Sequence, residues 1–248
     1  MDIALIWLLS LLTGVASGFI GSLSTGGGLI SIPALIFLGL NPAAAIATTR
    51  LSALSGAITA FLKWRKGDAI VWKQVPYFIV AATLGAVVGV KILLQINEEV
   101  LTVAVGILLL LMLPLLFFKK EFGTATAERS DKHRAIGLVL VFFIMIYGAV
   151  FGGGTGIFLT YALVHFFGMT IIQSNATGNV MWLVVTTIAL ISYILAGAVN
   201  FTVGIPLLIG AGIGGYVGAH TALKAGNGVV KWVFAIMIVL SSIKLIFF

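Results

Sequence analysis

The chain has 248 residues, of which 61% are hydrophobic and only 8% are charged, and its mean hydropathy is +1.23. Soluble domains carry about 25% charged residues, so this composition excludes a soluble globular domain. The absence of cysteine excludes disulfides and cysteine-ligated metal sites, and the net charge of +7 is more typical of cytoplasmic loops than of nucleic-acid binding. Apolar stretches of about 20 residues, the length that spans a bilayer, recur along the chain and predict an all-α polytopic membrane protein.

In chain order, the first half predicts a helical hairpin followed by three membrane-spanning helices. The hairpin covers residues 3–40, and its two apolar stretches are separated by the glycine run STGGG. Its N-terminal stretch lacks the positive region that begins a signal peptide, so we interpret it as the first mature segment. The spanning helices of this first repeat, residues 1–118, are predicted at 42–62, 70–95 and 99–118.

The second half repeats this pattern after a single polar loop. The loop, KKEFGTATAERSDKHR, covers residues 119–134 and divides the chain in two. The second repeat extends over 135–248 and begins with a hairpin at 135–167 that contains the glycine run FGGGTG. Its spanning helices are predicted at 170–195, 200–222 and 229–247.

A shift of about 129 residues brings the two halves into register. ATTR at 47–50 then lies over ATGN at 176–179, and LGAVVG at 84–89 lies over IGGYVG at 213–218. Several features in matching order favour an internal duplication over a chance alignment of glycine-rich helices. We interpret the glycines of the second pair as helix-packing positions, namely Gly85, Gly89, Gly214 and Gly218.

The positive charges predict that the two repeats are inverted in the membrane. Eleven of the 14 Lys and Arg residues lie at three junctions, 63–73, 119–134 and 224–231. Junctions rich in Lys and Arg are expected in the cytoplasm, whereas the junctions at 95–99 and 195–200 carry none and are expected outside. The two hairpins then enter from opposite faces, and both termini are expected outside.

The glycine runs interrupt helices at membrane depth, where irregular backbone survives only if it is buried in protein or lines a polar cavity. Hairpins from opposite faces would bring both runs near the bilayer centre, where secondary transporters bind their substrates. Glycine lets a ligand approach closely, and N–H groups at the start of a short helix attract anions. The alternative is that these glycines only let helices pack tightly. The candidate substrate-binding residues are Ser24, Thr25, Gly26, Gly27 and Gly28 in the first run and Gly153, Gly154, Thr155 and Gly156 in the second.

Arg50 is predicted to be the main side chain that binds substrate. It lies near the middle of a spanning helix, and all seven acidic residues fall at predicted helix ends or in loops. A bound carboxylate or sulfonate could therefore neutralise its planar guanidinium. The alternative is that Arg50 bonds carbonyl oxygens or snorkels. Other candidate ligands are Thr48 and Thr49 beside it, and Asn175, Thr177 and Asn179 at the matching positions of the second repeat; inter-helix contacts are the alternative for these.

No metal or cofactor is expected, and the coupling ion stays open. Because all acidic residues fall at the ends of predicted spans or in loops, proton coupling would have to use His165, His220, the substrate or water. Sodium coupling through carbonyl and hydroxyl oxygens, or no coupling, fits the sequence equally well.

Four motif features occur in order: a glycine run followed by proline, the stretch G-L-x-P-x-x-A-x-A-T, a basic W-R-x-G turn, and the same set again in the second half. These motifs resemble those of the TauE/SafE sulfite exporter family, also called the toluene-sulfonate uptake permease family. The resemblance implies an inner-membrane transporter for sulfite, sulfonates or related small organic anions. Two departures are that Ala162 replaces the proline in the second copy and that LAGAVN at 195–200 has no basic residue. The matching positions are Gly26, Gly27, Gly28, Pro33, Ala47, Thr48, Thr49, Gly153, Gly154, Gly156 and Thr177.

Two other functions fit some of the same features. An anion channel is one, because glycine-lined constrictions also conduct ions. An intramembrane serine protease is the other, since GSLS at 21–24 and His220 loosely resemble a serine–histidine pair. The expected partners are a small anionic substrate and the lipid bilayer, without nucleic acid, and a homo-oligomer stays open. The sequence also leaves open which anion is moved and in which direction.

Overall fold

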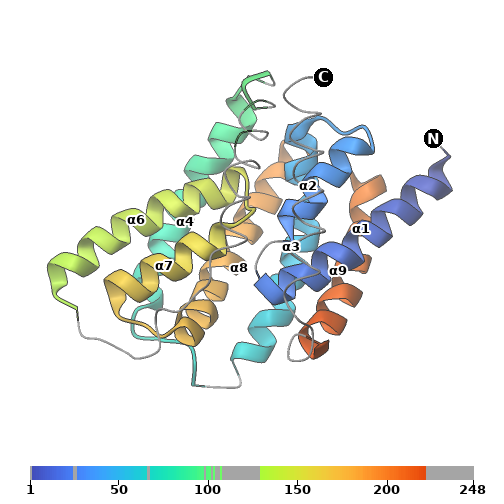
Figure 1. Ribbon diagram of the computed structural model, residues 1–248. Helices are drawn as coiled ribbons and strands as arrows, with labels where there is room; N and C mark the ends of the chain where they lie inside the picture. The colour runs from blue at the N-terminus through green and yellow to red at the C-terminus, as the bar shows by residue number, and fades with distance from the viewer. Residues whose placement is uncertain are drawn as a thin grey trace.

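The structure is a computed structural model that describes residues 2–24, 27–65, 68–97, 99–101, 103, 107 and 129–221. These residues form helices joined by turns, with no strand among them, which confirms the all-α part of the predicted fold class (Figure 1). The first half contains α1 (Ile3–Ser24), α2 (Gly28–Phe37), α3 (Pro42–Trp64) and α4 (Val75–Gln95). The second half contains α6 (Asp131–Val150), α7 (Thr155–Phe167), α8 (Ile171–Leu195) and α9 (Phe201–Thr221). The helices predicted at 99–118 and 229–247 lie mostly or wholly outside the described residues.

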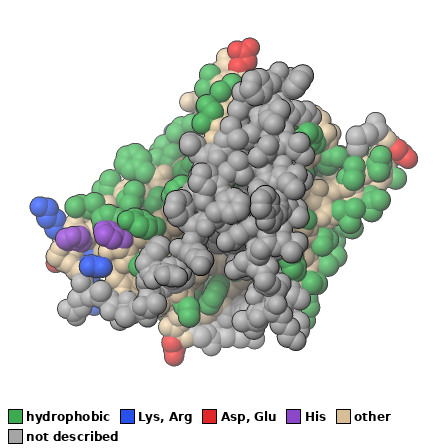
Figure 2. All heavy atoms as spheres, viewed as in Figure 1, with side chains coloured by type: hydrophobic (Ala, Val, Ile, Leu, Met, Phe, Trp, Pro, Cys, Tyr) green, Lys and Arg blue, Asp and Glu red, His purple; other side chains and the backbone are tan. Residues whose placement is uncertain are grey.

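Among the described residues, four helices are long and apolar enough to cross a membrane. They cover Pro42–Leu62, Val75–Gln95, Asp131–Val150 and Ile172–Leu195, while the apolar stretches of α1, α2, α7 and α9 are shorter. In the coloured parts of Figure 2, hydrophobic side chains predominate, and the charged side chains lie toward the margins of the view. This surface suits a hydrocarbon environment rather than water.

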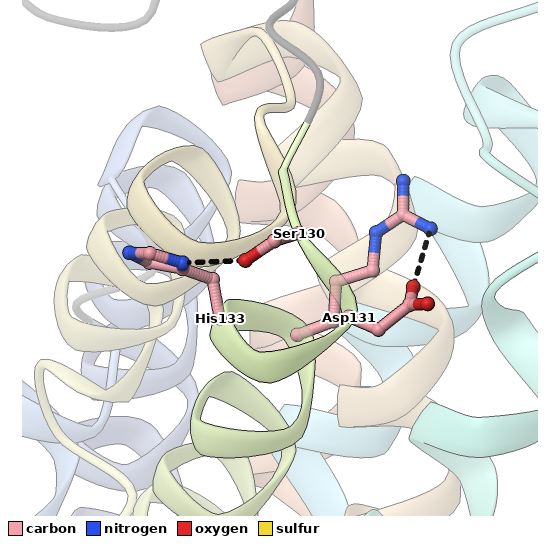
Figure 3. Close-up of polar contacts among 4 residues, drawn as sticks. Ser130, Asp131 and His133 are labelled. Carbon is pink, nitrogen blue, oxygen red and sulfur yellow. Dashed lines mark hydrogen bonds and ion pairs between the residues drawn. The ribbon is translucent and has the colours of Figure 1, made fainter.

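The structure corrects the predicted end of the central loop. Helix α6 begins at Asp131, so the last four residues of the predicted loop, 131–134, are helical. Ser130 has extended backbone at the helix start, and its Oγ lies 2.8 Å from Nδ1 of His133 (Figure 3). Asp131 in the first turn carries the charge that a helix N-terminus favours, and it lies 3.7 Å from Arg134. The polar run is therefore partly a charged first helical turn.

A second boundary also differs, at the start of α4. The sequence predicts a helix from residue 70, but residues 70–74 form turns, with N–H groups of Trp72 and Gln74 bonded to the carbonyls of Ile70 and Val71. Pro76 occupies the first turn of α4, where its missing N–H costs no helical hydrogen bond. Residues 70–74 therefore form a connection rather than helix, in which Ile70 is buried and Trp72 is exposed.

The closest helix pairs join opposite halves of the chain. Helix α1 packs along α9, and α4 packs along α6. A Cβ atom built on Gly210 would lie 2.1 Å from the carbonyl oxygen of Leu11, and one on Gly214 would lie 2.0 Å from that of Val15. Since both positions advance by four residues along each helix, α1 and α9 run in the same direction.

The same arrangement holds for α4 and α6. A Cβ atom on Gly85 would lie 2.7 Å from Cβ of Met145, and one on Gly89 would lie 2.6 Å from the carbonyl oxygen of Ile146. Gly85, Gly89 and Gly214 are thus packing positions, as predicted, because any side chain would collide with the partner helix. The surroundings of Gly218 lie outside what the structure describes.

The buried apolar residues form several clusters, of which one joins α2 and α3 to α4 and α8. Another cluster, which we call the left core, comes from α4, α6, α7 and α8 and includes Phe78, Met145, Leu163 and Val185. A smaller cluster, the right core, comes from α2, α3 and α9 and has Ile6 of α1 packed against it. Figure 1 shows α4, α6, α7 and α8 on the left and α1, α2, α3 and α9 on the right.

Candidate functional site

Both glycine runs break a helix, as the sequence predicts. Helix α1 ends at Ser24 and α2 begins at Gly28, while α6 ends at Val150 and α7 begins at Thr155. In the second run, Gly152 and Gly154 have φ angles of +85° and +75°, which glycine adopts at little cost. The hydroxyl of Thr155 donates to the carbonyl oxygen of Gly152 at 3.0 Å and so supports this break.

The two breaks lie against each other inside the molecule. A Cβ atom on Gly28 would lie 3.5 Å from the amide nitrogen of Gly153. Residues 152–155 are buried, and the carbonyl oxygen of Gly153 accepts a hydrogen bond from the Tyr147 hydroxyl. The structure thus brings Gly28 of the first half next to Gly153 of the second.

Some of these glycines are also tightly packed. A Cβ atom on Gly27 would lie 2.7 Å from the carbonyl oxygen of Ser17, and one on Gly153 would lie 2.7 Å from Cδ2 of Leu29. The packing alternative therefore has direct support at Gly27 and Gly153. Thr25 and Gly26 lie outside the described residues, as does the side chain of Ser24.

Arg50 is buried between the two halves. Only 2% of its surface is exposed, and its Nη2 donates to the carbonyl oxygen of Ala149 at 2.7 Å. The Tyr193 hydroxyl donates to the same carbonyl at 2.9 Å, and Cζ of Arg50 lies 5.7 Å from the centre of the Trp182 ring. The carbonyl-bonding alternative is therefore realised for one of the guanidinium nitrogens.

The guanidinium also lies beside the second helix break. A Cβ atom on Gly152 would lie 2.8 Å from Nη1 of Arg50 and 3.3 Å from Nη2, so only glycine leaves room for this side chain. Nε of Arg50 is buried and meets no hydrogen-bond acceptor among the described residues. Within the same part of the chain, the ion pair is Arg134 with Asp131, and no carboxylate pairs with Arg50. The buried positive charge is thus only partly satisfied by protein.

The predicted threonine ligands bond to backbone instead. Oγ1 of Thr48 accepts from the N–H of Asn200 at 3.0 Å, and Oγ1 of Thr177 accepts from the N–H of Val71 at 3.0 Å. The Thr49 hydroxyl donates to a carbonyl of its own helix. All three threonines are buried. The three hydroxyls therefore already take part in hydrogen bonds to backbone, and contacts of this structural kind are the alternative to substrate binding that the sequence left open.

The asparagines differ from each other. Oδ1 of Asn175 accepts from the Thr160 hydroxyl at 2.9 Å, which ties α8 to α7. Oδ1 of Asn179 is buried and has no hydrogen-bond partner among the described residues. Asn179 therefore keeps a free acceptor, whereas Asn175 has a structural contact.

Sequence reasoning missed Trp182 and Tyr193 of α8. The ring of Trp182 lies beside the Arg50 guanidinium, and the Tyr193 hydroxyl shares its carbonyl acceptor. Trp182 and Tyr193 are eleven residues apart, close to three helical turns, and so lie on one face of α8. Asn179 precedes Trp182 by three residues and shares this face. A helical projection of α8 could have indicated a polar and aromatic face, but not that it meets Arg50.

A model of the sulfite exporter TauE/SafE family matches residues 10–245 of the chain. The chain belongs to the TauE/SafE sulfite exporter family. Similar proteins include a probable membrane transporter protein of Haemophilus influenzae, 26% identical over 100% of this chain and 97% of that protein. Another is the probable membrane transporter protein YfcA of Escherichia coli K12, 26% identical over 93% of this chain and 86% of YfcA.

A third relative is the probable membrane transporter protein YunE of Bacillus subtilis, 23% identical over 94% of this chain and 95% of YunE. The TauE/SafE assignment and these names make the chain a membrane transporter, which confirms the predicted resemblance. No solved structure matches the chain significantly.

Proposed function

We propose that the chain is a secondary transporter that moves small sulfur-containing or organic anions, such as sulfite or sulfonates, across the inner membrane. The observation that carries this proposal is Arg50, a buried cation held against the helix break of the other half with no carboxylate partner among the described residues. The family name supplies the sulfur-containing class. An anion at this place would satisfy a charge that the protein satisfies only in part.

The chemistry of the site suits an oxyanion. The planar guanidinium matches the spacing of carboxylate or sulfonate oxygens, and its Nε is free to donate. The N–H groups of Gly153, Gly154 and Gly156 meet no acceptor among the described residues. These groups stand at the start of α7, where the helix dipole also favours negative charge.

The packing directions support inverted repeats with both termini outside. If the junctions rich in Lys and Arg face the cytoplasm, α1 and α9 must both run inward, and α4 and α6 must both run outward. The contacts of Gly210 and Gly214 with α1, and those of Gly85 and Gly89 with α6, agree with these directions. We therefore propose that the two glycine breaks approach each other from opposite faces of the membrane.

Counterflow in proteoliposomes tests the function. Vesicles loaded with unlabelled sulfite or methanesulfonate should accumulate the labelled anion by exchange. The same experiment with acetate tests whether carboxylates are also transported. A channel would pass the anion without stimulation by internal substrate, which would contradict the transporter proposal. Absence of flux with every sulfur anion would contradict the proposed substrate class.

A further inference from the structure

The contacts between helices divide the described helices into two groups that differ from the two halves of the sequence. The left core draws its members from α6, α7 and α8 of the second half and from Met169 between α7 and α8, together with α4 and the turn before it from the first half. The right core combines residues of α1, α2 and α3 with α9 of the second half. Each group therefore holds three helices of one half and the fourth helix of the other (Figure 1).

Paired hydrogen bonds attach each exchanged helix to its group. Thr48 on α3 accepts from the N–H of Asn200, the residue before α9, and Thr177 on α8 accepts from the N–H of Val71, which precedes α4. Thr177 follows Thr48 by the same 129 residues that separate Asn200 from Val71. The two bonds are thus counterparts, and each joins the third helix of one half to the fourth of the other.

Contacts inside each group leave no room for sliding. Along α1 and α9, Cβ atoms built on Gly14 and Gly214 would fall 2.3 and 2.0 Å from carbonyl oxygens of the opposite helix. Such backbone-to-backbone packing interlocks the helices, since any relative shift would make atoms collide.

Contacts between the groups have a different character. Among the described helices, the extensive contact across this boundary is that of α3 with α8. Two clusters of apolar side chains also cross it, one that joins α2 and α3 to α4 and α8, and one that joins the end of α3 to the start of α4 and to α8. Beside it, Gly28 meets Gly153, and Arg50 reaches Ala149 with one hydrogen bond. Arg50 has a long side chain that can exchange a carbonyl for an anion without a change in its own helix. The boundary that can rearrange therefore coincides with the proposed binding site.

We infer that the moving units of this transporter are two exchanged bodies, α1–α2–α3–α9 and α6–α7–α8–α4, which move against each other at α3 and α8. This inference rests on the proposed transport function, because alternating access requires two bodies that move around a shared site. Thr48 and Thr177 are positioning residues that keep each fourth helix on the body of the opposite half.

Spin-label distances can separate this arrangement from movement of the sequence halves. The chain has no cysteine, so single cysteines can be placed at four lipid-facing positions, Leu8 on α1, Ile92 on α4, Val139 on α6 and Tyr216 on α9. All four side chains are at least 41% exposed. The spin labels are attached to the cysteines through thioether bonds, because sulfite would cleave a label attached through a disulfide.

Four pairs of these sites form a matched set. The pairs 8–216 and 92–139 join different halves within one body, whereas 8–92 and 139–216 join different bodies within one half. We expect narrow, constant distances for the first two and broader distances that shift with sulfite or methanesulfonate for the last two. Narrow 8–92 and 139–216 distances with broad 8–216 and 92–139 distances would overturn the inference, as would four equally narrow distributions.

The same four distances distinguish an error in the proposed transport function from an error in the assignment of the two moving bodies. If the apo distributions separate as expected but no anion shifts them, the two bodies stand and the proposed substrate class is wrong. Thr48→Val should broaden the 8–216 distance and Thr177→Val the 92–139 distance, because each loses a bond between body members. Thr49→Val is the matched control, since its hydroxyl bonds its own helix. Unchanged distances in both variants would overturn the role of the two threonines.

Discussion

Arg50 combines three conditions at the scale of one residue: nearly complete burial and, among the described residues, one carbonyl acceptor and no acceptor for Nε. A charged group in such surroundings is costly unless something compensates it. The ring of Trp182 contributes a weak attraction to the cation, and the Ala149 carbonyl contributes a hydrogen bond. We propose that the remaining compensation comes from the transported anion.

Substitution of Arg50 should weaken anion binding in a graded way. Arg50→Lys keeps the charge and loses the planar fork, so we expect binding to fall by roughly 1–3 kcal/mol, and Arg50→Gln should lose more. The measurement is the rise in melting temperature with anion concentration, because a ligand stabilises the folded state according to its Kd. Arg134→Gln, an arginine paired with Asp131 outside the apolar part of α6, is the control. Unchanged binding by Arg50→Gln would make Arg50 structural.

Gly152→Ala should displace the guanidinium. The new Cβ would lie 2.8 Å from Nη1 of Arg50, and the φ angle of +85° adds strain of about 1–2 kcal/mol. We expect loss of anion-induced stabilisation together with a lower melting temperature. Gly197→Ala isolates the strain, because Gly197 has a φ of +68° and nothing within 4 Å of a Cβ. Equal effects of the two substitutions on anion binding would contradict a role for this contact.

At the scale of helices, small residues set how closely two helices approach. In membranes, packing rather than hydrophobic burial holds helices together, so a loss of close approach is felt directly. Gly214 of α9 and Gly85 of α4 are related by the 129-residue shift, and both contact a helix of the opposite half. The predicted duplication thus coincides with matching packing positions.

Gly214→Ala should destabilise the fold by about 1–3 kcal/mol, the usual cost of overpacking. Its Cβ would lie 2.0 Å from the carbonyl oxygen of Val15 and would force α1 and α9 apart. Gly56→Ala in α3 has nothing within 4 Å and should be neutral or stabilising, because alanine favours helix by about 1 kcal/mol. Thermal unfolding in detergent measures both. A melting temperature for Gly214→Ala at or above that of Gly56→Ala would show that the helices are free to adjust.

At the scale of the whole molecule, the proposed topology rests on the distribution of positive charge and on the parallel helix pairs. Single cysteines at Lys132 and Ala196, both exposed, should react with an impermeant maleimide from opposite sides of the membrane. Lys132 should be protected in intact cells and Ala196 accessible. A cysteine at Asn41, next to the predicted outer end of α3, is a further control and should behave like Ala196. Labelling of Lys132 and Ala196 from the same side would contradict inverted repeats.

The sequence alone predicted most of the helices and the two breaks, since both depend on local properties. Runs of apolar residues determine which segments can span a bilayer, and glycine runs interrupt them. The errors at 70–74 and 131–134 have local reasons too. A stretch with apolar residues can be a turn between helices, and a charged stretch can be the first turn of a helix.

Only the tertiary structure decided which helices meet and what each polar side chain contacts. The pattern of Thr48 and Thr177 is the same whether a hydroxyl binds substrate or the N–H of a distant helix, so the sequence could not separate these roles. The position of Arg50 against Gly152 depends on the packing of α3 on the other half, about 100 residues away in sequence. Periodicity along one helix tells which residues share a face, but the partner of that face is selected by close packing in three dimensions.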